Sequence, residues 1–199
     1  MNQLARRPLP HMTADDFLAW PGDGTGRKFQ LIDGEVRVSP ASHDHGTIQS
    51  RLAFLLWGGI EAAGVPLLVL TEGAVIPGLN ASTNVRVPDL VVTGTPGERG
   101  QQTVTDPVLL VEVLSPGNQD DTRDNARAYA TLASVQEIAV LHSTRMLAEV
   151  HRRDAAGNWL PNPEYAGEGD RLTLTSARLD CPIEDVYRGT WLSRRAENA

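Results

Sequence analysis

The sequence predicts an α/β or α+β domain built on a central sheet. Three observations favour this class: short apolar runs suited to buried strands, two segments with the period of an amphipathic helix set between them, and Gly and Pro residues that separate the runs. With 199 residues and 41% apolar content, the chain is long enough for one core of good size and too short for two domains to be expected. We therefore expect a single domain.

The N-terminal half predicts a short helix, a hairpin and a long helix. Thr13 is a suitable N-cap for the first helix. Asp33 and Gly34 form the favoured two-residue turn of a tight β-hairpin, because apolar and polar residues alternate on both sides of them. Gly64 is the expected stop of the long helix. The expected elements are, in order, a helix from Thr13 to Pro21, strands 28–32 and 35–39, and a helix from about Asp44 to Gly64.

The C-terminal half predicts most of the sheet. Strands 85–92 and 108–114 are nearly unbroken in apolar character, as expected for a sheet covered on both faces. The last residues, from Ser193, are expected to fray. The expected elements are strands 67–71, 85–92, 108–114 and 137–141, a helix from Asp120 or Asp121 to about Ala133, a hairpin from Met146 to Trp159, strand 171–175, and a short helix from Pro182.

The composition restricts the function classes. A net charge of −7 and a pI near 5.2 argue against coating nucleic acid by charge alone, although a local basic groove remains compatible with them. No run approaches the roughly 18 apolar residues of a membrane span, and the N-terminus lacks an apolar leader segment, so we expect a cytoplasmic protein without membrane contact. The single cysteine, Cys181, excludes an internal disulfide and a thiolate metal cluster.

Two acidic residues interrupt apolar runs. Asp89 lies in RVPDLVV and Glu112 in VLLVEVLSP. A buried carboxylate is costly unless it is paired, protonated or bound to a cation. Together, two such groups can offer four oxygens to Mg²⁺ or Mn²⁺, which polarises a phosphodiester and lowers the pKa of a bound water. The alternatives are a glycosidase pair, which only 5% aromatic residues disfavour, and for Asp89 an ordinary turn carboxylate after Pro88.

Four segments together resemble a known family. They are FQLIDGEVRVSP (29–40), RVPDLVV (86–92), LLVEVLSPGN (109–118) and DTRDNARAYATLASVQEIAVL (121–141). Their order resembles the Uma-two family of restriction endonucleases, within the PD-(D/E)XK nuclease superfamily. The resemblance implies one nuclease domain over residues 13–190, with flexible ends at 1–12 and 193–199. It also implies a restriction-endonuclease-like mixed sheet flanked by helices, a homodimer, and metal-dependent hydrolysis of nucleic acid, DNA in the first place.

The resemblance assigns roles to three central residues. Asp89 and Glu112 match the metal ligands, for Mg²⁺ or Mn²⁺. The family's lysine lies four residues before a tyrosine, here Tyr129, and Asn125 occupies that position. Asparagine can orient a water but carries no charge to offset a developing anion, so catalysis is expected to be weakened or lost. The alternative function is therefore a catalytically inactive, homodimeric binding or scaffold protein.

Three further residues are candidates for supporting roles. Glu35 matches a glutamate of the family's hairpin, and His45 matches a histidine near the start of the long helix. Arg127 is a basic candidate on the later helix. Each also has an ordinary reading: an outward strand residue, a helix N-terminal polar group and a solvated helix charge, respectively. Lys28, the single lysine, is not expected to reach the site.

A homodimer is also suggested by apolar residues near the end of the chain. A contiguous exposed apolar patch is a usual sign of an interface. The alternative is that these residues cover their own core. They are Val186, Tyr187, Trp191 and Leu192.

Overall fold

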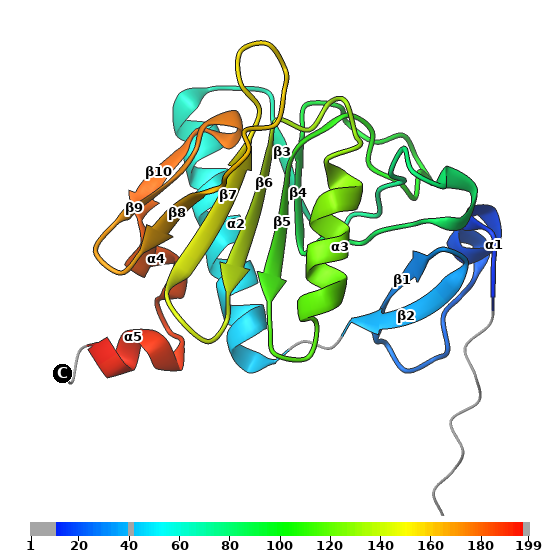
Figure 1. Ribbon diagram of the computed structural model, residues 1–199, viewed down its shortest axis with the longest axis horizontal. Coiled ribbons are helices and arrows are strands. Elements are labelled where there is room, and N and C mark those ends of the chain that lie inside the picture. The colour runs from blue at the N-terminus through cyan, green and yellow to red at the C-terminus, as the bar shows by residue number, and fades with distance from the viewer. Residues whose placement is uncertain (1–10, 40–41, 197–199) are drawn as a thin grey trace, which may run out of the picture.

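A six-stranded mixed sheet forms the centre of the computed structural model, which describes residues 11–39 and 42–196 (Figure 1). The strand order is β3-β4-β5-β6-β7-β8, and only β5 and β6 run parallel. This is the mixed central sheet that the sequence predicted. Its strands are β3 (Leu68–Thr71), β4 (Leu90–Thr93), β5 (Pro107–Leu114), β6 (Glu137–His142), β7 (Leu147–Arg152) and β8 (Glu164–Gly167).

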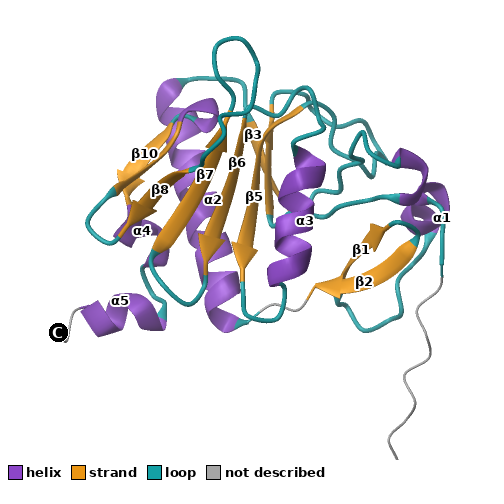
Figure 2. Cartoon of the chain, viewed as in Figure 1, coloured by secondary structure: helices purple, strands orange, loops and turns teal. Residues whose placement is uncertain are grey.

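Two helices cover opposite faces of this sheet. Helix α3 (Gln119–Tyr129) lies in front of the strands in Figure 2 and helix α2 (His43–Ala63) behind them. Successive residues of β5 therefore alternate between two cores. Val111 packs in the cluster that includes α2, whereas Leu110 packs with Tyr129 of α3. By the same alternation, Glu112 belongs to the face that α3 covers.

The ends of the two helices follow local sequence signals. The side chain of Ser42 accepts a hydrogen bond from the third residue of α2, and Gly64 ends the helix with φ +63°. Helix α3 ends at Tyr129, whereas the sequence suggested an end near Ala133. The reason is a local turn, because the backbone N–H groups of Thr131 and Leu132 bond to the last carbonyls of the helix.

The N-terminal hairpin docks beside the chain that enters β4. It joins β1 (Lys28–Ile32) to β2 (Glu35–Ser39) and follows helix α1 (Ala14–Ala19). Asp33 and Gly34 both have positive φ, +49° and +84°, as the tight turn requires. The backbones of Leu31 and Val85 exchange two hydrogen bonds of 2.8 and 3.0 Å. This bridge places the face of β1 against the end of the central sheet and helix α3 (Figure 1).

The C-terminal elements pack on the α2 side of the sheet. Val186 and Tyr187 are fully buried in the main cluster, and Leu192 packs against it. Three of the four residues that suggested a dimer interface therefore cover their own core, leaving Trp191 at 39% exposure. The remaining elements are β9 (Arg171–Leu174), β10 (Leu179–Pro182), α4 (Ile183–Tyr187), α5 (Trp191–Ala196) and the 3-10 turns Ala81–Thr83 and Thr175–Ala177.

The expected flexible ends are only partly described. Helix α5 contains residues of the segment from Ser193 onward and runs to Ala196. Residues 1–10 and 197–199 lie outside the described residues. Among the helices of the described ranges, none is long and apolar enough to cross a membrane.

Candidate active site

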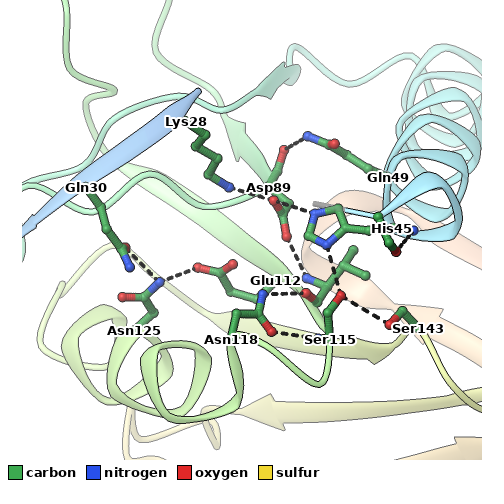
Figure 3. Close-up of polar contacts among 12 residues, drawn as sticks. Lys28, Gln30, His45, Gln49, Asp89, Glu112, Ser115, Asn118, Asn125 and Ser143 are labelled. Carbon is green, nitrogen blue, oxygen red and sulfur yellow. Dashed lines mark hydrogen bonds and ion pairs between the residues drawn. The ribbon is translucent and has the colours of Figure 1, made fainter. Parts of the chain in front are cut away.

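The pairing of β4 with β5 sets the two predicted carboxylates opposite each other. Leu90 pairs with Val111 in the antiparallel register, so the next position brings Asp89 across from Glu112. The backbone N–H of Val113 donates a 2.7 Å hydrogen bond to Oδ2 of Asp89, which ties this side chain to β5. Both carboxylates are buried, with exposures of 1% and 3% (Figure 3).

Asp89 lies between two basic side chains. Nζ of Lys28 donates to Oδ1 at 2.6 Å, and Nε2 of His45 lies 3.0 Å from the same oxygen. Gln49 of α2 donates to the backbone carbonyl of Asp89 at 2.8 Å, which fixes the backbone just before β4. Burial raises the pKa of Asp89, but the hydrogen bond with His45 and the charge of Lys28 outweigh it and hold the pKa below its usual value. Asp89 is therefore ionised.

Glu112 has a different environment. Oε1 accepts hydrogen bonds from the Tyr129 hydroxyl at 2.5 Å and from Nδ2 of Asn125 at 2.8 Å. Among the described residues no hydrogen bond reaches Oε2. Burial, and then the charge of Asp89, raise the pKa of Glu112 well above its usual value, despite the opposing effects of Lys28, Tyr129 and Asn125. A cation bound at this oxygen would relieve the cost of ionising Glu112.

Asn125 connects Glu112 to a buried arginine. Its Nδ2 donates to Glu112 and to Oε1 of Gln30 at 3.0 Å, while its Oδ1 accepts from Nη1 of Arg86 at 2.9 Å. Arg86 is 6% exposed, and its Nη2 donates to Oδ1 of Asn84 at 2.9 Å. Within the described ranges, Nε of Arg86 has no partner. Burial lowers the pKa of this guanidinium, whose direct acceptors are neutral amides.

The structure brings some of the sequence-predicted residues together and separates others. Asp89, Glu112, Asn125 and His45 converge. Glu35 does not join them: its side chain is 67% exposed and pairs with Arg37. Arg127 likewise points into solvent at 80% exposure and pairs with Asp124 of its own helix. The structure therefore places Glu35 and Arg127 as exposed, outward-facing charges away from the two carboxylates.

Lys28 is the main residue that sequence reasoning misplaced. It was not expected to reach the site, yet it contacts Asp89 across 61 positions of sequence. A signal was present in the hairpin, because Lys28 and Gln30 are two residues apart and so project from the same face of β1. Gln30 is a polar residue that is only 2% exposed, and Figure 3 shows both side chains directed at the carboxylates and Asn125.

The sequence also provided no indication of a chain of polar contacts behind His45. Nδ1 of His45 lies 3.4 Å from Oγ of Ser115, which accepts a 3.1 Å hydrogen bond from Oγ of Ser143. Asn118 accepts from the backbone N–H of Ser115 and donates to the carbonyl of Val113. These contacts fix the turn after β5 and the orientation of the imidazole.

The two carboxylates suit a hard divalent cation. In the part of the chain that the structure describes, no group of three or more His, Cys, Asp or Glu forms a ready metal centre. Mg²⁺ nevertheless commonly takes one or two protein carboxylates and completes its shell with water and phosphate oxygens. The unpartnered Oε2 of Glu112 and its raised pKa are the features that fit such an ion.

The mixed sheet between two helices, with one acid just before β4 opposite another within β5, is typical of a nuclease-like α/β domain. The model of the Uma2 (Uma-two) family, described as putative restriction endonuclease, matches residues 14–181, and the chain belongs to this family. It is also similar to the crystal structure of a putative nuclease from Anabaena variabilis, with a TM-score of 0.70, 19% identity, and coverage of 88% of this chain and 97% of the other. That likeness supports the fold. A comparison of the chain with curated proteins found no match.

Proposed function

We propose that the protein is a divalent-metal-dependent nuclease that hydrolyses phosphodiester bonds in DNA. The observation that carries this proposal is the pair of buried carboxylates, Asp89 and Glu112, placed face to face by the β4–β5 register. One of them is held ionised and the other carries a raised pKa, and such divergent environments are typical of functional acids. Membership of a family of restriction-endonuclease-like proteins supports the same reaction.

Asp89 and Glu112 would hold Mg²⁺ or Mn²⁺. When bound, the ion would polarise a phosphodiester oxygen and lower the pKa of a water molecule. The protein residues around the pair supply preorganisation. The N–H of Val113 orients Asp89, and Tyr129 and Asn125 orient Glu112 through the same oxygen, so that the other oxygen remains available.

DNA is the proposed substrate, and its binding should depend on local charge. The net charge of −7 opposes binding by the molecule as a whole. The basic groups near the carboxylates, Lys28 and Arg86, offset this locally. We therefore expect affinity for DNA to fall steeply with added salt, since phosphate contacts are lost by counterion competition.

The competing function is a non-catalytic nucleic-acid-binding relative. Asn125 favours it, because this residue replaces a charged one and all of its hydrogen-bonding groups are used within the protein. It has no donor left for a phosphate oxygen. The binding function would retain the carboxylate site and lack turnover.

Cleavage assays separate the two functions. Circular duplex and single-stranded DNA should be cut in Mg²⁺ or Mn²⁺ and remain intact in EDTA. Asp89→Asn and Glu112→Gln should abolish cutting, whereas Glu98→Gln, which changes an exposed acid in a distant loop, should not. DNA that stays intact with both Mg²⁺ and Mn²⁺, together with measurable DNA binding, would refute the nuclease proposal and favour the non-catalytic binding function.

A further inference from the structure

Lys28 is the single lysine of the chain. The other basic residues among the 18 Lys and Arg are arginines. This one lysine is the residue whose ammonium lies 2.6 Å from Asp89, with only 11% of its side chain exposed. Lysine and arginine differ in chemistry: lysine provides a compact charge on a flexible stem, whereas arginine provides a rigid planar fork.

The position of Lys28 is fixed by backbone structure. It opens β1, where its backbone pairs with Ser39, and the hairpin is attached to the sheet by the Leu31–Val85 bridge. The ammonium therefore approaches the carboxylates from the side opposite α2 (Figure 3).

We propose that Lys28 is the catalytic cation of this site: its ammonium contacts the phosphate and stabilises the negative charge that develops during hydrolysis. This inference rests on the proposed nuclease function. An ammonium has three N–H donors, and one of them is used by Asp89. Among the described residues the other two have no acceptor, so they can donate to oxygens of a phosphate placed at the carboxylates.

The other cations near the site are committed elsewhere. Arg86 uses both of its terminal nitrogens on the side-chain amides of Asn84 and Asn125. Arg123 forms a two-point contact of 2.6 and 2.7 Å with Glu149 of β7. Arg127 points into solvent. Of Lys28, Arg86, Arg123 and Arg127, only Lys28 thus contacts a carboxylate of the pair.

Lys28 has a second consequence for metal binding. Without a metal it is a counter-ion of Asp89, and a divalent cation must share that carboxylate with it. Two cations near one carboxylate repel each other. Removing the charge of Lys28 should therefore leave Mn²⁺ affinity unchanged or increase it, while hydrolysis becomes slower. If Lys28 had only a structural role, its removal would not slow hydrolysis while leaving Mn²⁺ affinity unchanged or increased.

The test compares Lys28→Met with Arg27→Met, which removes a charge from the neighbouring, more exposed residue. Mn²⁺ affinity is measured by titration of DNA-free protein, and cleavage is measured in single-turnover reactions at saturating Mn²⁺. We expect Lys28→Met to cut DNA about 10²- to 10³-fold more slowly, the usual effect of removing one group that stabilises the transition state. Its Mn²⁺ affinity should equal or exceed that of the wild type. Arg27→Met should change neither quantity.

A chemical rescue guards against misfolding of the methionine variant. Lys28→Cys in a Cys181→Ser background can be aminoethylated, which restores an ammonium at nearly the original length. The rescue should return at least tenfold in rate. Cleavage by Lys28→Met within threefold of the wild type, loss of Mn²⁺ binding together with cleavage, or a failed rescue in folded protein would each overturn the role of Lys28. If the wild type itself does not cut DNA, the proposed function fails first.

Discussion

Replacing Glu112 with glutamine should change how the stability of the protein depends on pH. Glutamine has the shape of glutamate, and its amide oxygen can still accept from Tyr129 and Asn125. The variant removes only the titration. Burial and the neighbouring Asp89 raise the pKa of Glu112 from 4.5 to about 8, so the folded protein holds this proton at a pH where the unfolded chain has released it.

The sign of the effect follows from proton binding. Between about pH 4.5 and 8 the unfolded state binds fewer protons at Glu112 than the folded state, so this residue lowers the free energy of unfolding as pH rises. At about 1.36 kcal/mol for each pH unit, the upper limit is about 5 kcal/mol. Local rearrangement around a buried charge reduces the penalty, and we expect about 2 to 4 kcal/mol. Asp89, whose pKa is lowered, acts in the opposite sense and mainly below pH 4.

Urea unfolding in EDTA at pH 5, 6, 7 and 8 measures this effect. The wild type and Glu112→Gln should be similarly stable at pH 5, and the variant should be the more stable by about 2 to 4 kcal/mol at pH 8. Both proteins contain the same histidines, so the difference between the two curves isolates Glu112. Glu98→Gln serves as the control. Parallel curves for the wild type and Glu112→Gln would show that Glu112 is already ionised in the folded protein, and the electrostatic account would be wrong.

Two further predictions concern the metal and Asn125. Saturating Mn²⁺ should raise the melting temperature of the wild type, by the equivalent of about 2.7 kcal/mol at a hundredfold excess over Kd. The same metal should leave the melting temperature of Asp89→Ala unchanged. Equal melting curves for both proteins would show that the metal is not bound at Asp89. Asn125→Lys should lower the free energy of unfolding by about 2 to 4 kcal/mol, because Arg86 loses its acceptor and gains a neighbouring cation, and a second change, Arg86→Met, should restore part of it. An Asn125→Lys protein as stable as the wild type would contradict the bridging role of Asn125.

The carboxylate pair could be predicted from sequence because it breaks a strong pattern. Asp89 and Glu112 are acids beside long apolar runs, and β4 and β5 are consecutive strands of one sheet. Pairing of consecutive strands is the commonest arrangement, so the distance between these two residues in space follows from their order in the chain. The alternation of β5 then places Glu112 on the face of α3.

Lys28 could not be placed by the same reasoning. Its approach to Asp89 depends on where the hairpin docks, and the Leu31–Val85 bridge that decides this joins short segments with no pairing signal of their own. Glu35 follows the turn, at the end of the hairpin remote from Lys28. Four residues of strand separate these two ends by roughly 13 Å, at about 3.3 Å per residue. A motif match to Glu35 therefore says little about its distance from the carboxylates.

The helical candidates were in principle distinguishable from sequence. Asn125 and Tyr129 are four residues apart and share one face of α3, and both contact Glu112. Arg127 lies midway between them, and a residue two positions along a helix points away from that face. This direction explains why the side chain of Arg127 is 80% exposed. Here the periodicity of the helix was a better guide than the charge of the residue.

The buried charges around the carboxylates account for an uncharged residue at position 125. Lys28 neutralises Asp89 directly, and Arg86 faces Glu112 through the amide of Asn125. Two cations thus already lie beside the two acids, of which only Asp89 is ionised near neutral pH, in a buried region where an unmatched charge is costly. A lysine at position 125 would add a third cation beside Arg86. If Lys28 supplies the ammonium from the hairpin, as we propose, an uncharged residue at position 125 suits the buried charges of the site and is compatible with catalysis.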